Sequence, residues 1–334
     1  MDIVTQGLAG AVLAQSFSKG KETRIALAVG FLAGLLADID ALFTRSEVDP
    51  LLQLDFHRHF THSLFFIPFG GLIAAILLWP VMRRYLPFRR MLLFTTAGYA
   101  TSGIIDACTS YGTSLLWPLS DARISWSIIS ILDPLFSLAL IAAIVFAAVK
   151  QAPRYAMFGI CFALSYLLLG FAQHQRVEAM AMALAESRGH QVERLEVKPT
   201  MGNLLLWRSI YEAGGRFYID AFRASFIGEE RLYPGESVKR FELTDLPQIS
   251  ELSMMAQDIR RFDTFSDGYI ALSPGTELLI GDIRYSMLPN AVRPIWGIRI
   301  DLAEQERHTP FHQHYDTSEQ TRQMFIDMLF GKDV

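Results

Sequence analysis

Long apolar stretches dominate the first half of the chain, whereas the second half changes between polar and apolar residues over short runs. A transmembrane helix needs roughly 20 apolar residues, and four stretches come close to this length: Ile25–Phe43, Ser63–Val81, Met91–Ala107 and Ile128–Val149. A fifth stretch, Tyr155–Phe171, is slightly shorter but carries no charge. The pattern predicts an α-helical membrane bundle of about five transmembrane helices over residues 1–175.

The first apolar stretch, Ile3–Phe17, is too short to span a membrane alone and is rich in Gly and Ala. Small residues let helices approach closely in membranes, so we expect a short N-terminal helix packed against the bundle. Because no basic residue precedes this stretch, it does not resemble a cleavable signal peptide.

Residues 176–334 predict a soluble α+β domain with an antiparallel sheet. Helices are expected at Arg176–Arg188, where Gly189 provides the stop, at about Pro247–Phe262 and near Ser318–Phe330. Gly214 and Gly215 signal a hairpin turn. The expected strands are Arg194–Val197, Leu204–Tyr211, Arg216–Ala224, Val238–Leu243, Tyr269–Leu272, Leu278–Tyr285 and Trp296–Leu302.

Charge separates the same two regions. Of the 64 Asp, Glu, Lys and Arg residues, 22 precede Gln175 and 42 follow it. The net charge of −4 and the lack of a basic stripe exclude a nucleic-acid partner. Cys108 and Cys161 both lie in apolar stretches, so the second region has no disulfide framework.

The basic residues of the short connections predict the orientation, because they concentrate on the cytoplasmic side. One set of connections holds nine of them: Lys19, Lys21, Arg24, Arg83, Arg84, Arg89, Arg90, Lys150 and Arg154. The opposite set holds three: Arg45, Arg58 and Arg123. We therefore expect an inner-membrane protein whose C-terminal domain lies in the periplasm.

Carboxylates and imidazoles gather on the predicted outer face. Of the ten acidic residues before Gln175, only Glu22 falls on the cytoplasmic side. Neutral imidazoles and carboxylates are the ligands of Zn²⁺ and similar divalent ions. The candidate metal ligands, which come from several segments, are Asp38, Asp40, His57, His59, His62 and Asp106.

Spacing adds detail to this prediction. His59 and His62 are three residues apart, so on a helix they would share a face. Asp38 and Asp40 would diverge on a helix, so both can bind one ion only if that helix end unwinds.

Further polar residues on the same face suit catalysis. Arg58 and Arg123 could grip a phosphate, for which a guanidinium is well suited, or could instead pair with Asp55 or Asp121. A carboxylate that binds no metal, Asp121 or Asp133, could accept a proton from water.

At these residues the sequence resembles the family of membrane-bound, metal-dependent hydrolases of the bacterial inner membrane that are described as LexA-regulated. The matching pieces are Met1–Gly7, Gly34–Asp40, His57–Ser63, Asp106–Pro118, Ser120–Arg123 and Ile131–Pro134. Pro199–Arg208 resembles the start of the periplasmic domain in one branch. Two positions depart from the pattern: Gln6 stands where many relatives have His, and Ala37 where Pro is common.

The resemblance implies hydrolysis of a phospholipid or another phosphoester with one or more divalent ions, foremost Zn²⁺, and membrane lipid as the partner. The alternatives are a transporter or scaffold without enzymatic activity, and a relative that has lost its activity. A transporter should carry ionisable residues through the whole bilayer, whereas here they lie on one side. His308, His312 and His314 could bind metal, but such patterns are common and unspecific, so we expect a solvated surface loop.

Overall fold

The chain folds into two compact units in the computed structural model, which describes residues 1–43, 46, 48–275 and 277–334. The first unit comprises Met1–Thr44, Phe56–Ala172 and Met201–Asn203. The second comprises Arg45–Asp55, Gln173–Thr200 and Leu204–Val334. Arg45, one of the three basic residues assigned to the outer connections, lies outside the described residues.

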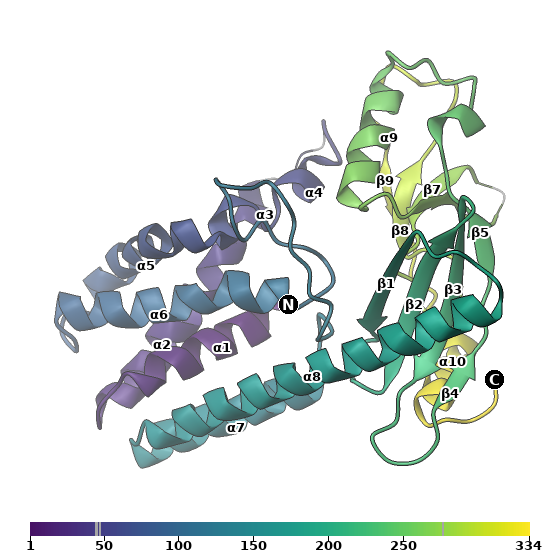
Figure 1. The fold of residues 1–334 in the computed structure, drawn as a ribbon. Helices are drawn as coiled ribbons and strands as arrows, with labels where there is room; N and C mark the ends of the chain where they lie inside the picture. The colour runs from purple at the N-terminus through teal and green to yellow at the C-terminus, as the bar shows by residue number, and fades with distance from the viewer. Residues whose placement is uncertain (44–45, 47, 276) are drawn as a thin grey trace. The chain divides into compact units, whose positions relative to one another are not determined.

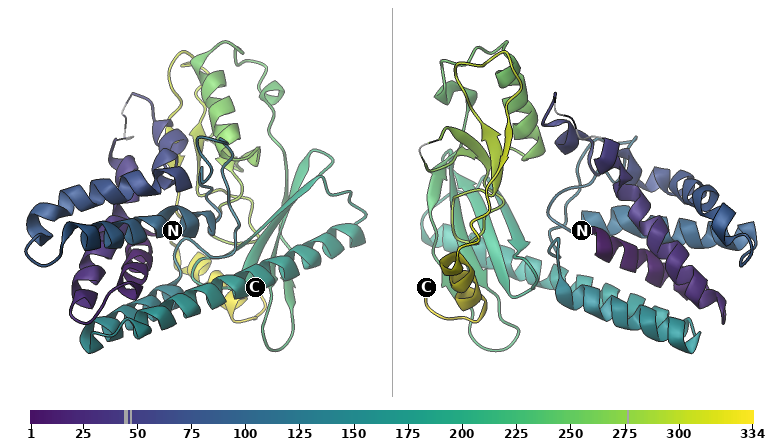
Figure 2. Two further views of the ribbon diagram at one scale, coloured as in Figure 1. Left: turned by 60° about the vertical axis from the view of Figure 1, so that its left-hand side comes forward. Right: turned by 180° about the vertical axis from the view of Figure 1, so that it is seen from behind.

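The first unit is helical, as expected (Figure 1). Helices α1, α2 and α6 pack on one another, and α5 packs on α6. Helix α7 runs beside the first part of α8, which both views of Figure 2 also show. The helices are α1 (Ile3–Ser16), α2 (Glu22–Leu35), α5 (Ile67–Met82), α6 (Phe88–Ala107), α7 (Pro134–Lys150) and α8 (Arg154–Ser187).

Three glycines bring α1, α2 and α6 together at one point. A Cβ atom at Gly98 of α6 would lie 2.5 Å from the carbonyl oxygen of Gly30 in α2, and a Cβ at Gly10 of α1 would lie equally close to it. Real Cβ atoms do not approach an oxygen so closely. The backbones therefore touch directly, as small residues permit in membrane bundles.

The number of membrane crossings differs from the expectation. Among the described residues, two helical stretches are long and apolar enough to span a membrane: Leu64–Met82 and Arg154–Ser187. The expected figure of about five is therefore wrong. Helix α2 ends after 14 residues, α7 has 17, and α6 is diluted by polar residues such as Thr95, Tyr99 and Ser102.

Both spanning candidates leave their apolar surface open, since only 22% of each apolar window is buried. The core helix of a soluble protein would instead be mostly buried. On α5, for example, Phe69, Ile76 and Leu77 are about 60% exposed. Such a surface fits contact with lipid.

Short turns replace regular helix where the candidate ligands lie. Helix α2 passes into the 3₁₀ turn η1 (Leu36–Ile39) and then α3 (Asp40–Phe43). The helix end at Asp38 and Asp40 therefore tightens and does not unwind, and the two carboxylates lie beside different imidazoles, Asp38 beside His62 and Asp40 beside His57. The following elements are α4 (Leu52–Phe56), η2 (Phe60–His62) and η3 (Leu64–Phe66).

Two further helix boundaries differ. Helix α7 begins at Pro134 rather than near Ile128, because Asp133 caps its N-terminus and Pro suits the first helical position. The two helices expected at Tyr155–Phe171 and Arg176–Arg188 are one continuous helix of 34 residues. Polarity changes along α8, but no residue in it breaks the helix.

The second unit contains two antiparallel sheets, which confirms the expected α+β class. One sheet has the order β1-β2-β3-β4, with β5 also paired to β3; the other has the order β6-β7-β8-β9. Ile210 and Phe217 of the first sheet share a core with Ala271 of the second. The strands are β1 (Arg194–Pro199), β2 (Leu206–Ala213), β3 (Arg216–Arg223), β4 (Arg231–Tyr233), β5 (Ser237–Lys239), β6 (Ile270–Leu272), β7 (Leu279–Asp282), β8 (Trp296–Arg299) and β9 (Phe311–Gln313).

Two helices complete this unit. Helix α9 (Met254–Phe265) starts later than expected because Ser253 caps it. Helix α10 (Glu319–Leu329) places Met328 against Leu206 of the first sheet, on the face seen from behind in Figure 2. The sequence did not predict the short strands β4 and β9. His312 lies in β9, so it is part of a strand and not of the expected loop.

We predict that Gly98→Leu destabilises the first unit by about 1–3 kcal/mol, because the added side chain must push α6 away from α2. Thermal unfolding of the purified protein in detergent would measure the loss. The matched control is Ala142→Leu on the exposed face of α7, which should unfold like the unaltered protein. Equal unfolding temperatures for the two variants would contradict the close packing.

Candidate metal centre

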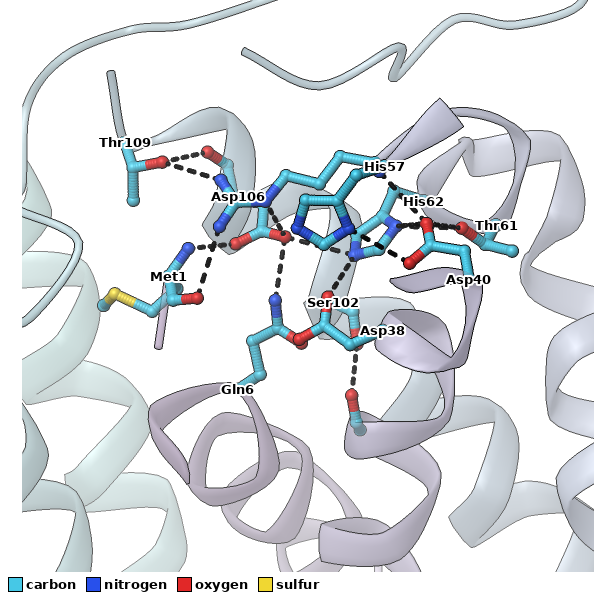
Figure 3. A network of polar contacts seen from close by, with 12 residues as sticks. Met1, Gln6, Asp38, Asp40, His57, Thr61, His62, Ser102, Asp106 and Thr109 are labelled. Carbon is cyan, nitrogen blue, oxygen red and sulfur yellow. Dashed lines mark hydrogen bonds and ion pairs between the residues drawn. The ribbon is translucent and has the colours of Figure 1, made fainter. Parts of the chain in front are cut away.

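The buried polar groups of the first unit meet where α2 and α6 end (Figure 3). Asp38 lies in η1, Asp106 lies in the last turn of α6, and His62 ends η2. Thus three segments that are distant in sequence each contribute one ionisable side chain. His62 and Asp106 are fully buried, and Asp38 is 12% exposed.

Three ligand atoms converge at this point. Nε2 of His62 lies 3.2 Å from Oδ1 of Asp38 and 3.1 Å from Oδ2 of Asp106. Neither approach has the direction of a hydrogen bond. The three atoms lie within 4.8 Å of one another, which is a spacing that one cation could bridge.

Asp106 has the densest set of partners. Its Oδ2 accepts a hydrogen bond of 2.8 Å from Nε2 of Gln6 in α1 and lies 3.3 Å from Nε of Arg58. Its Oδ1 pairs with the Met1 nitrogen. A buried carboxylate is stable only when it is paired and hydrogen-bonded, and Asp106 meets both conditions.

A second carboxylate–imidazole pair lies beside the first. Nδ1 of His57 lies 3.1 Å from Oδ1 of Asp40. The other oxygen of Asp40 accepts hydrogen bonds from the backbone N–H of Arg58, at 3.0 Å, and from the Thr61 hydroxyl, at 2.8 Å. The Thr61 hydroxyl also lies 3.0 Å from Nδ1 of His62. Thr61 therefore connects the two imidazole groups through Asp40.

Local backbone geometry places these side chains. Gly103 of α6 lets η2 approach, because a Cβ there would overlap the carbonyl oxygen of His62. Arg58 has a φ of 60°, which non-glycine residues seldom adopt. This conformation directs its N–H to Asp40 and its guanidinium to Asp106. Strained residues of this kind cluster at functional sites.

The electrostatics of His62 favour a positive charge. Burial opposes protonation of the imidazole, but the carboxylates of Asp106 and Asp38 outweigh it and raise the pKa of His62 to about 9. The two carboxylates thus create a negative potential at Nε2 of His62. A divalent cation placed among these three atoms would meet that potential.

The donor set fits such a cation. Asp38, Asp106 and His62 supply the oxygen and nitrogen ligands that Zn²⁺ and Mn²⁺ accept. Oε1 of Gln6 is also buried and accepts no hydrogen bond from the described residues. The amide oxygen of Gln6 is thus available where relatives were expected to supply His. Asp38, Asp40 and His57 form a second group within the same spacing.

The structure places four of the sequence-predicted site residues elsewhere. His59 packs against the ring of Trp117, at 5.7 Å, because residues 57–59 are not helical and the expected shared face with His62 does not form. Asp133 caps α7 and accepts a hydrogen bond of 2.8 Å from Tyr166. Asp121 is exposed. Arg123 donates to the carbonyl oxygens of Gly112 and His57, at 3.0 and 3.4 Å.

Other members of the network were not singled out from the sequence. Tyr99 donates a hydrogen bond of 2.6 Å to the carbonyl of Thr61, and Ser102 donates one of 2.9 Å to the carbonyl of Gly34. Thr109 lies 3.3 Å from the Arg58 guanidinium. In the sequence these three residues stand out only as polar residues in or just after an apolar stretch. Such residues are too common to identify a site.

A groove of about 430 Å³ opens beside Asp38 and His57. Its remaining lining is apolar and comes from α1, α2, η1 and α3. The larger apolar side chains are Ile3, Leu32, Leu35, Leu36 and Ile39.

A separate ion-pair network lies in the second unit. Arg261 of α9 contacts Asp55 at 2.6 Å, Asp49 at 3.0 Å and Asp258 at 3.1 Å. Asp258 also lies 3.1 Å from Nδ1 of His308. His308 is therefore part of this network, and the expected solvated loop is wrong for this residue. Asp49, Asp258 and His308 have a spacing that a metal ion could bridge. Because Arg261 already pairs with all three carboxylates, we assign the network a structural role.

Comparison with known proteins gives one match. The family model described as "YdjM inner membrane protein" matches residues 1–177. No curated protein and no solved structure matches the chain.

We predict that Arg261→Gln lowers the unfolding temperature at pH 7 and that its effect shrinks as the pH falls toward 3. Partial burial alone would raise the pKa of Asp49, but the hydrogen bond from Arg261 lowers it below its ordinary value. The pair therefore adds stability above the ordinary pKa of about 3.9, and this stability is lost as Asp49 protonates.

Unfolding temperatures of both proteins from pH 7 to 3 would test this. Arg260→Gln, on the exposed side of α9, serves as the control. A gap between Arg261→Gln and the unaltered protein that does not shrink between pH 7 and pH 3 would contradict the assignment.

Proposed function

Because the chain belongs to the YdjM inner membrane protein family, we propose that it is an inner-membrane, metal-dependent hydrolase of a phospholipid or another phosphoester. The observation that carries the proposal is the convergence of His62, Asp38 and Asp106 without hydrogen-bond geometry between them. Costly buried charges at a membrane protein's helix ends mark functional sites.

In this proposal Asp38, His62 and Asp106 hold the cation, with the Gln6 amide oxygen available as a further ligand. When bound, a divalent cation lowers the pKa of a water ligand toward about 7 and stabilises negative charge on a phosphoryl group. Arg58 neutralises Asp106 from the other side, so its role is to fix this carboxylate.

His57 is the proposed proton acceptor. Asp40 orients its imidazole through Nδ1, and Asp40 is itself fixed by Arg58 and Thr61. The imidazole is 18% exposed and borders the groove, so it can reach a water molecule there. A carboxylate that orients an imidazole in this way is a common arrangement for general base catalysis.

The proposal also places the site at the periplasmic face of a multi-pass protein. The excess of basic residues in the other connections supports this orientation. The C-terminal unit, which follows the apolar part of α8, would then be periplasmic.

A scaffold role is the second candidate. The Arg58 and Gln6 contacts already stabilise Asp106, as they would if the network only fixed helix packing. Metal content separates the two roles.

We predict near-stoichiometric Zn, Mn or Fe in protein purified in detergent without an affinity-tag metal, and loss of most of it in His62→Ala and Asp38→Ala. Elemental mass spectrometry would measure it. His59→Ala is the matched control, since this histidine lies outside the ligand groups. A folded protein that takes up neither Zn²⁺ nor Mn²⁺ would refute the hydrolase and favour the scaffold.

We predict that His57→Ala keeps its metal but loses hydrolysis by about 10²–10⁴-fold, the usual contribution of a general base. The assay is release of product from a panel of phospholipids and soluble phosphoesters. His62→Ala should lose both metal and activity. If His57→Ala loses its metal as well, His57 is a ligand rather than the base.

A further inference from the structure

The groove beside Asp38 and His57 has the polarity of an amphiphile. Its polar lining is confined to these two residues, both members of the candidate centre, and the rest is apolar. A molecule that fills it must therefore present a polar end to the centre and an apolar body to α1 and α2.

The groove is open along its apolar side. Ile3 is 52% exposed, Leu32 44% and Ile39 37%. Water covers such apolar side chains poorly, and the chain belongs to an inner-membrane family. An apolar hollow left unfilled would lose dispersion contacts along its walls, so an acyl chain is the occupant that matches both its lining and the membrane setting of the family.

The walls of the groove are preformed. Helices α1 and α2 touch through backbone atoms: a Cβ on Gly34 of α2 would lie 2.9 Å from the carbonyl oxygen of Gln6 in α1. Two helices held this closely cannot move together to close the groove. A preformed apolar site of this kind is typical of small-ligand pockets.

From this geometry we propose that the groove holds one acyl chain of a phospholipid and brings its phosphate to Asp38 and His57 from the side of the bilayer. The inference rests on the proposed function for the identity of the phosphoester. It adds that the substrate is a lipid and that its chain, as well as its head group, is bound by the protein.

Lipid retention tests the groove without any need for turnover. The full chain is purified in detergent, supplied with a lysophospholipid analogue that has a phosphonate in place of the phosphoester, and washed by detergent exchange. Native mass spectrometry then counts the analogue molecules retained. We expect one per chain for the unaltered protein and at least tenfold less occupancy for Leu32→Trp, which fills the groove.

The matched control is Leu77→Trp, a substitution at an exposed leucine of α5 outside the groove. It should retain the analogue like the unaltered protein. Unchanged metal content and unfolding temperature show that Leu32→Trp is folded; if it is not, Leu32→Phe replaces it. Retention that is absent in the unaltered protein, or equal in both tryptophan variants, overturns the groove assignment.

Turnover separates this inference from the proposed function. If the groove is correct, Leu32→Trp raises KM for long-chain phospholipids at least tenfold more than it raises KM for a water-soluble phosphoester. Retention without any hydrolysis supports the groove and refutes the hydrolase. Hydrolysis of both substrates at unaltered rates in Leu32→Trp refutes the groove and supports the hydrolase.

Discussion

The burial of the Asp106 carboxylate is the constraint on which the first unit depends. A charged group without water is stable only if neighbouring groups replace the hydrogen bonds and the opposite charge that water and ions would supply. Gln6, Arg58 and His62 do so, and each comes from a different segment. Satisfying one carboxylate therefore fixes α1, the segment after α4 and η2 against the end of α6.

This polar end is possible because the apolar parts of the helices pack so closely. Direct backbone contact at Gly10, Gly30 and Gly98 leaves little freedom for α1, α2 and α6 to shift. Gly103 extends the same principle to the centre, where it lets the His62 main chain lie against α6. A site whose side chains are held by rigid elements is preorganised.

The sequence predicted the class of each region and the ligands that converge, because these depend on residue type and on which helix end carries a charge. Asp38, Asp40, His57, His62 and Asp106 were identified in this way. The roles of His59 and Asp133 were not predictable, because they depend on side-chain direction. Residues 57–59 are not helical, so His59 and His62 do not share a helix face. Asp133 instead caps its own helix and accepts a hydrogen bond from Tyr166.

Helix length was the second limit of the sequence. Hydropathy finds apolar residues but not the points where a helix tightens or ends. It therefore did not predict that α2 ends where the turn η1 begins at Leu36. Conversely, α8 continues through a change in polarity that resembled a boundary. The three-residue strands β4 and β9 were also missed.

The segment between Asp40 and His57 gives the chain an unusual connectivity. These two residues form one hydrogen-bonded pair in the first unit, yet Arg45–Asp55, which joins them along the chain, belongs to the second. Arg261 holds Asp55, only two residues before His57. The chain thus leaves the first unit after one partner of this pair and returns to it just before the other.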